Sequence, residues 1–230
     1  RDQDISWEQH VKLGKFFGSL QSHPAYNSPP NYPEITILES TRDNPSKIEC
    51  WHTDMTFLKN PPLCSILRSK ICPSKGGDTM WSSMTAAYES LSESMKNFLK
   101  NLTAEHDFCH GFKESIAEPG GRERLKDAIK NNPPVVHPVI RTHPITKRKA
   151  IFVNPLFTTK INELSKSESD ALLEFLYSYS ITPEFTCRFS WTPNSIAIWD
   201  NRCTLHKPIN DYFPEHRLLE RITVDGDEPF

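Results

Sequence analysis

Short β-like runs separated by turn residues are the feature that most constrains this sequence. Turn pairs such as Pro61-Pro62, Gly76-Gly77 and Pro193-Asn194 lie between them. The runs cover residues 35–40, 63–70, 78–83, 135–142, 149–154, 185–191, 195–200 and 217–224. A parallel α/β sheet would need a helix between most successive strands, and the sequence has too few helical patterns for that. We therefore predict a mainly β fold with flanking helices, of the sandwich or jelly-roll type.

A few helical patterns flank the β-like runs. The two clearest begin after Ser6 and Ser165, each of which precedes a Gln or Glu by three residues, as in a capping box. Two more helices are expected over residues 84–102 and 122–130. The motifs described below lie on both sides of Pro133-Pro134, so we predict a single domain over residues 1–230.

The charge balance and the apolar content exclude two classes of partner. Lys and Arg total 27 against 29 Asp and Glu, which gives a net charge of −2, whereas a nucleic-acid binder needs a basic face. No apolar run reaches the length that crosses a bilayer. The six cysteines include no C-x-x-C pair, so we expect reduced thiols in a cytoplasmic protein. The first residue is Arg1 rather than Met, and we expect a further N-terminal segment.

The segment Trp51-His52-Thr53-Asp54 offers two metal ligands two residues apart. On an extended strand, residues i and i+2 point to the same face, so the imidazole and the carboxylate can converge. A third ligand would complete the two-histidine, one-carboxylate triad that is typical of non-haem Fe(II) oxygenases. The tripeptide His-x-Asp is common by chance, so it needs support from elsewhere in the chain.

A second group of polar residues lies near the C-terminus. His206 is expected in a loop just past an apolar strand. Along the β-branched terminal strand, alternate positions are Arg217, Leu219, Arg221 and Thr223. Both guanidinium groups would then face the same side, where they repel each other unless an anion lies between them. The alternative is a solvated strand face whose arginines pair with Glu215, Glu220 or Asp225.

Several motifs together resemble one family. WHTD (51–54), GGDT (76–79), WDNR (199–202), His206 and Arg217 are similar to the taurine dioxygenase family of Fe(II)- and α-ketoglutarate-dependent oxygenases. The resemblance extends over essentially the whole chain and implies a double-stranded β-helix, or jelly roll. It continues through EHDF (105–108), NNPPVVHPVIRTHP (131–144), FVN and FTT (152–159) and GDEPF (226–230).

The resemblance implies an enzyme that hydroxylates taurine at the carbon bearing the sulfonate. Fe(II), α-ketoglutarate and O₂ would be needed, and sulfite, aminoacetaldehyde, succinate and CO₂ would be released. The site residues that the resemblance implies are His52, Asp54 and His206 for Fe(II) and catalysis, Thr79 and Arg217 for α-ketoglutarate, and His23, Tyr26, Arg221, Phe112 and Phe157 for the substrate.

One position departs from the family pattern. Taurine dioxygenases place Asn three residues before the Trp of WHTD, whereas this chain has Ile48. If Ile48 lines the pocket, taurine's ammonium group loses a polar partner there. An alkylsulfonate, an alkyl sulfate or an aryloxyalkanoate is then an alternative substrate.

Two other functions and the expected partners complete the hypotheses. The chain could be an anion-binding jelly roll without iron, or a metal-dependent hydrolase that uses the same three ligands. We expect a small-molecule sulfonate as partner, no nucleic acid, no membrane, and a homo-oligomer such as a dimer or tetramer.

A zinc site at His106 and His110 is disfavoured, because residues i and i+4 of a strand lie about 13 Å apart. His137 and His143 are expected at strand ends.

Overall fold

The computed structural model describes residues 1–46 and 48–230, in which every strand pair is antiparallel. The sequence predicts a mainly β fold with flanking helices, and the structure is mixed, with many antiparallel strands and a substantial share of helix. The strands are β1 (Leu20–Gln21), β2 (Ile35–Ser40), β3 (Cys64–Ile71), β4 (Thr79–Ser83), β5 (Thr103–His106), β6 (Val135–Pro138), β7 (Ile140–Thr142), β8 (Lys149–Ile151), β9 (Thr158–Ile161), β10 (Thr186–Phe189), β11 (Ile196–Asp200), β12 (Thr204–Pro208) and β13 (Arg217–Val224).

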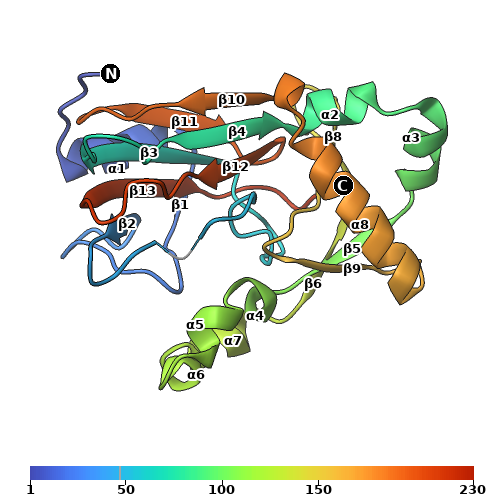
Figure 1. Cartoon of the computed structure of the whole chain (residues 1–230), viewed down its shortest axis with the longest axis horizontal. Coiled ribbons are helices and arrows are strands. Elements are labelled where there is room, and N and C mark those ends of the chain that lie inside the picture. Colours follow the sequence, from blue (N-terminus) through green and yellow to red (C-terminus); the bar gives the residue numbers. More distant parts are fainter. Residues whose placement is uncertain (47) are drawn as a thin grey trace.

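Two sheets form the layers that carry the polar motifs. In the larger sheet β13 pairs with β3 along one edge and with β1 and β2 along the other, and β11 pairs with β3. The smaller sheet has the order β10-β4-β12. The sheets pack through aromatic side chains, since the rings of Trp81 on β4 and Trp199 on β11 lie 5.6 Å apart. Figure 1 shows these strands stacked at one end of the molecule.

The two longest helices, α1 and α8, pack into different apolar cores. The helix α1 packs Val11 against Ile35, Ile66 and Ile222 of the larger sheet, and α8 packs Leu172, Leu173 and Leu176 into a separate apolar core. The helices are α1 (Trp7–Phe17), α2 (Met84–Ser90), α3 (Glu93–Leu99), α4 (Phe108–Gly111), α5 (Lys113–Ala117), α6 (Gly121–Arg124), α7 (Lys126–Asn131), α8 (Lys166–Ser180) and the 3₁₀ turn η1 (Pro183–Phe185).

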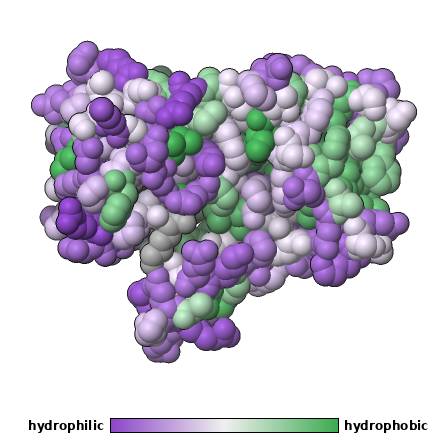
Figure 2. Space-filling view, in the orientation of Figure 1, coloured by the Kyte–Doolittle hydropathy of each residue, from purple (hydrophilic) through white to green (hydrophobic). Residues whose placement is uncertain are grey.

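The rest of the chain builds two small sheets and a projecting lobe. The strands β6, β5 and β9 form one sheet, and β7 and β8 form a two-stranded ribbon. The helices α4 to α7 project as a lobe whose visible surface is mainly hydrophilic (Figures 1 and 2). No helix among residues 1–46 and 48–230 is long and apolar enough to span a membrane.

The capping-box predictions are confirmed, whereas three predicted elements are divided. Ser6 and Ser165 both cap their helices, with Gln9 and Glu168 completing the boxes. The helix expected over 84–102 is divided. The helix α2 ends at Ser90, and Ser92 accepts a hydrogen bond from the backbone N–H of Met95 and caps α3, which ends at Leu99. The helix expected over 122–130 is interrupted between α6 and α7, and the strand expected over 135–142 is interrupted between β6 and β7.

Candidate active site

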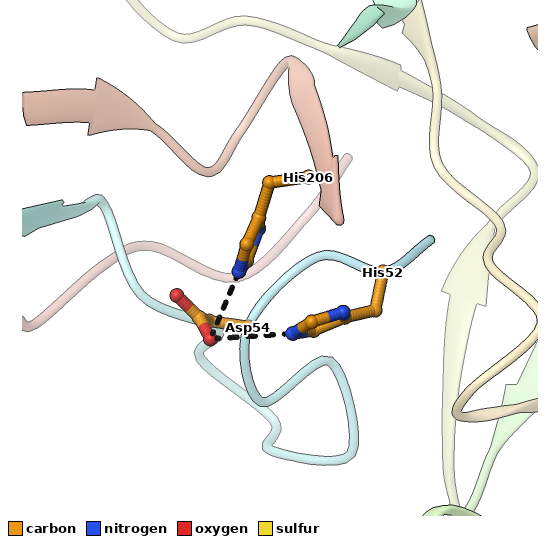
Figure 3. Close-up of side chains that lie close together, drawn as sticks. All are labelled: His52, Asp54 and His206. Carbon is orange, nitrogen blue, oxygen red and sulfur yellow. Dashed lines mark ion pairs between the residues drawn. The ribbon is translucent and has the colours of Figure 1, made fainter. Parts of the chain in front are cut away.

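Three buried side chains meet between β12 and the loop that precedes β3. The Nε2 atoms of His52 and His206 lie 3.9 Å and 3.8 Å from Oδ1 of Asp54 (Figure 3). The ligand atoms of all three residues lie within 4.8 Å of one another. The sequence therefore identified a group of side chains that the fold brings together.

The local backbone at this group differs from the expectation. His52 and Asp54 do not share a strand, because the chain turns at Asp54 and Met55 takes a φ of +45°. His52 instead makes an isolated β-bridge to His206, with backbone hydrogen bonds of 2.9 Å and 2.7 Å in the two directions. His206 itself lies on β12 rather than in a loop. The two imidazoles therefore converge through strand pairing, and the turn brings in the carboxylate.

Burial keeps both imidazoles neutral. Burial and, to a smaller extent, the neighbouring His52 together lower the pKa of His206 to about 3. Burial also lowers the pKa of His52, although Asp54 opposes the shift. The Nδ1 atom of His52 lies 3.1 Å from the carbonyl oxygen of Cys50, so it must carry the proton and donate it. The lone pair of His52 is then on Nε2, which faces Asp54.

Asp54 is ionised in spite of its burial. Desolvation alone would raise its pKa, but Arg221, His206 and His52 more than offset this and hold the pKa well below its usual value. Nη1 of Arg221 donates to Oδ1 of Asp54, and the Ser65 hydroxyl lies 2.6 Å from Oδ2. Each carboxylate oxygen thus has its own partner.

Arg217 and Arg221 on β13 are both buried, so the alternative of a solvated strand face is wrong. Their neighbour Glu220 is also unavailable to them, because it pairs with Arg68 on the opposite face of the strand. The Nε of Arg217 donates to the carbonyl of Gly77 at 3.1 Å. Thr79 accepts a hydrogen bond from the indole of Trp191 at 2.9 Å, so its own hydroxyl proton is left to donate.

The second glycine of GGDT, Gly77, lies where a larger side chain would clash with its neighbours. Gly77 has a φ of +71°, and a Cβ there would lie 2.8 Å from Pro73 Cγ and 3.3 Å from Cδ and Nε of Arg217. The backbone therefore approaches Arg217 more closely than any other residue would allow.

The remaining predicted residues gather beside Arg221. The ring centroids of His23 and Tyr26 lie 4.6 Å apart, and that of Phe112 lies 6.1 Å from His23 and 6.3 Å from Phe157. Burial and, to a smaller extent, the charge of Arg221 together lower the pKa of His23 to about 3. Nδ1 of His23 accepts the backbone N–H of Ala25 at 3.1 Å, so this neutral imidazole carries its proton on Nε2.

The loop after Asp54 rests on a hydrogen-bond network that sequence reasoning missed. His106 and Asn154 both bond the Thr56 hydroxyl, at 2.9 Å and 3.0 Å, and His137 bonds the Thr56 carbonyl at 2.9 Å. His106 belongs to the motif EHDF and Asn154 to the motif FVN. Polar residues within such apolar runs were the sequence signal that could have indicated this network. No group of possible metal ligands among the described residues contains His106 or His110.

A second group of possible ligands, His143, Asp200 and Cys203, is already satisfied. Nδ1 of His143 accepts two backbone N–H groups, from Ile145 and Thr146, so its Nε2 carries the proton that bonds Asp200 at 3.0 Å. Asp200 is also held by Arg202 through two hydrogen bonds of 2.9 Å and 2.6 Å. This group is therefore a hydrogen-bonded ion pair rather than a metal site.

Comparisons with known proteins give relatives that include an alkylsulfatase and a sulfonate dioxygenase. An alkylsulfatase from Acinetobacter baylyi is 35% identical over 228 residues, which cover 98% of this chain and 71% of that protein. An α-ketoglutarate-dependent sulfonate dioxygenase from Saccharomyces cerevisiae is 33% identical over 232 residues, which cover 95% of this chain and 54% of that protein. The chain spans 60% of the length of a relative from Schizosaccharomyces pombe that is 33% identical.

Structural similarity and a family model agree with these relatives. The crystal structure of a taurine dioxygenase from Burkholderia xenovorans matches with a TM-score of 0.83 and 35% identity, over 100% of this chain and 75% of that one. The model of the family described as "Taurine catabolism dioxygenase TauD, TfdA family" matches residues 1–223. The chain therefore belongs to the TauD, TfdA family of taurine catabolism dioxygenases.

Proposed function

We propose that this chain is an Fe(II)- and α-ketoglutarate-dependent dioxygenase that hydroxylates the carbon bearing the sulfo group of a small organosulfur anion. The observation that carries the proposal is the convergence of two neutral imidazoles and one carboxylate, all buried, within 4.8 Å of one another. Family membership supports the same activity. The motifs predict taurine as the substrate, with release of sulfite and aminoacetaldehyde.

The donor set fits Fe(II). His52 presents an Nε2 lone pair because its Nδ1 proton is used by Cys50, and Asp54 presents Oδ1 to both imidazoles. Two histidines and one carboxylate leave further coordination positions open for cosubstrate and O₂. Iron and α-ketoglutarate supply the oxidising chemistry, and the protein's own residues orient the reactants.

The residues around Arg217 fit a dicarboxylate. Arg217 is fixed by the Gly77 carbonyl, and the ring of Tyr212 lies 5.6 Å from its guanidinium carbon. The Nη groups of the Arg217 guanidinium would bind the distal carboxylate of α-ketoglutarate. The Thr79 hydroxyl would donate a second hydrogen bond, because Trp191 already occupies its acceptor side.

The residues around Arg221 fit a monoanionic head group. Arg221 supplies the charge, and His23 supplies an Nε2–H donor from a neutral ring. The rings of Phe112 and Phe157, with Phe57 behind them, offer an apolar wall beside these donors. Such a wall would exclude water from the reacting carbon.

A second substrate class is favoured by Ile48. This residue is half-buried in the loop before His52, and its carbonyl accepts a hydrogen bond of 2.8 Å from Asn210. An apolar side chain there suits an alkylsulfonate or an alkyl sulfate better than the ammonium group of taurine. The names of the Acinetobacter and Saccharomyces relatives support this class. An aryloxyalkanoate stays a weaker alternative.

The architecture proposed for the whole chain is a single jelly-roll domain over residues 1–230. The two facing antiparallel sheets and the packing of Trp81 against Trp199 support it. A dimeric or tetrameric assembly and a cytoplasmic location stay predictions.

The test is the stoichiometry of product release. The protein is incubated with Fe(II), α-ketoglutarate and O₂ together with taurine, pentanesulfonate or an alkyl sulfate of the same chain length. Succinate formed in equal amount with sulfite or sulfate supports the proposal. The compound that yields sulfite or sulfate identifies the substrate class. Absence of succinate with every substrate, from protein that binds Fe(II), would contradict the dioxygenase proposal and leave the anion-binding and hydrolase alternatives.

A further inference from the structure

A chain of three buried hydrogen bonds leads from the WDNR segment to Asp54. The indole N–H of Trp199 donates to Oδ1 of Asn201 at 2.9 Å. The amide Nδ2 of Asn201 donates to the Ser65 hydroxyl at 2.9 Å, and that hydroxyl lies 2.6 Å from Oδ2 of Asp54. Ser65 and Asn201 are 0% and 1% exposed, so water does not compete for these bonds.

The direction of every bond in this chain is determined. An indole can only donate, so it fixes the carbonyl side of the Asn201 amide and turns the NH₂ side toward Ser65. Because the Ser65 oxygen accepts from Asn201, its own proton is free for Asp54. That proton is directed at Oδ2 of Asp54, whose other oxygen accepts from Arg221. These three hydrogen bonds, from Trp199 through Asn201 and Ser65 to Asp54, are called the relay below. The relay always places a hydrogen-bond donor at Oδ2 of Asp54.

Ser65 occupies Oδ2, and Oδ1, which also accepts from Arg221, is the oxygen that faces the two imidazoles. Figure 3 shows Oδ1 of Asp54 directed at both imidazoles and Oδ2 directed away from them. The ring of Trp199 also lies 4.8 Å from that of His206, so this one side chain contacts one ligand directly and reaches another through the relay. Both ends of the relay thus act on the same three-residue group.

We propose that Trp199, Asn201 and Ser65 are positioning residues that hold Asp54 as a one-oxygen ligand. The inference rests on the proposed Fe(II) site. Without the Ser65 hydroxyl, Oδ2 would lose its donor, and the carboxylate could rotate and present both oxygens. Loss of a hydrogen-bond partner behind a metal ligand typically weakens metal binding by about 10- to 100-fold.

The test measures Co(II) binding under anaerobic conditions, by calorimetry and by the visible absorption of the bound ion. Ser65→Ala removes the donor, and Ser69→Ala is the matched control. Ser69 lies on the same strand and is also 0% exposed, but its hydroxyl bonds the Thr192 carbonyl at 2.6 Å. If Ser65→Ala fails to fold, Asn201→Ala is used, since it leaves the Ser65 hydroxyl without the bond that orients it.

We expect Ser65→Ala to bind Co(II) about 10- to 100-fold more weakly than the parent chain and to show a shifted absorption band. Ser69→Ala should bind Co(II) like the parent, with an unshifted band, even if it is equally destabilised. Parent-like affinity and absorption in folded Ser65→Ala, or in folded Asn201→Ala, would overturn the relay alone. A parent chain that binds no Co(II), or whose binding survives His206→Ala, would overturn the metal site and the relay with it.

Discussion

The contact between Gly77 and Arg217 makes a prediction that separates cosubstrate binding from stability. In Gly77→Ala, the new Cβ would lie 3.3 Å from two atoms of Arg217 and 2.8 Å from Pro73 Cγ. The second distance is shorter than real Cβ contacts, so the loop or Arg217 must move. Arg217 is the more mobile neighbour, because the proline ring is fixed to the backbone.

The expected effect has two parts. A side chain at a φ of +71° costs roughly 1–2 kcal/mol of stability. If displaced Arg217 loses one charge-assisted hydrogen bond to a carboxylate, binding weakens by about 1.5–3 kcal/mol. This corresponds to a roughly 10- to 150-fold higher Kd for α-ketoglutarate.

The assay is calorimetric titration of α-ketoglutarate in the presence of Mn(II), together with thermal unfolding. Gly120→Ala is the control, because Gly120 has a φ of +73° but no atom within 4 Å of an added Cβ. Both variants should lower Tm, and only Gly77→Ala should weaken α-ketoglutarate binding. Unchanged affinity in Gly77→Ala, or an equal loss in Gly120→Ala, would refute the argument that Gly77 positions Arg217.

Three further predictions follow from single residues. His206→Ala should abolish Co(II) binding in calorimetry while circular dichroism shows the native fold, because one of three ligands is lost. Ile48→Asn should raise the ratio of kcat/KM for taurine over pentanesulfonate by about fivefold in a sulfite-release assay, the value of one hydrogen bond; an unchanged ratio would exclude Ile48 from the pocket. Burial lowers the pKa of His10 to about 4 from 6.5, so unfolding takes up a proton between these values and stability falls as pH drops. Between pH 6.5 and 5 the parent should lose about 1.5 kcal/mol more of its unfolding free energy than His10→Phe does in urea unfolding. Equal losses would contradict the shift.

The parts of the fold that depend on local signals could be predicted from the sequence. The strand over 217–224 has the observed bounds because its β-branched residues Ile222, Thr223 and Val224 favour extended backbone locally. The helices after Ser6 and Ser165 begin where a capping box places them. In contrast, β12 was missed because Thr204–Pro208 has little strand propensity of its own and is extended by its pairing with β4.

Some residues of the candidate site could be predicted from the sequence, and others could not. The residues proposed as metal ligands, such as His52 and His206, could be named because the motifs around them resemble the family pattern. Residues that position them could not, because Ser65 is an ordinary serine in a strand until the fold brings Asn201 and Asp54 to it. The turn at Asp54 was also hidden, since it depends on the pairing of His52 with a residue more than 150 positions away.

The charges at the site bear on which substrate fits. Arg217 and Arg221 contribute two buried positive charges, Asp54 contributes one negative charge, and both histidine ligands are neutral. Fe(II) would add two positive charges and α-ketoglutarate two negative ones, which leaves one positive charge uncompensated. Buried charge is costly unless it is paired, so a monoanionic sulfonate or sulfate ester balances the site. Taurine carries an ammonium group as well, so its binding would leave one positive charge uncompensated unless a polar group of the protein contacted the ammonium. Since Ile48 replaces the asparagine of the family pattern, the charge balance and the sequence both favour a substrate with an apolar tail.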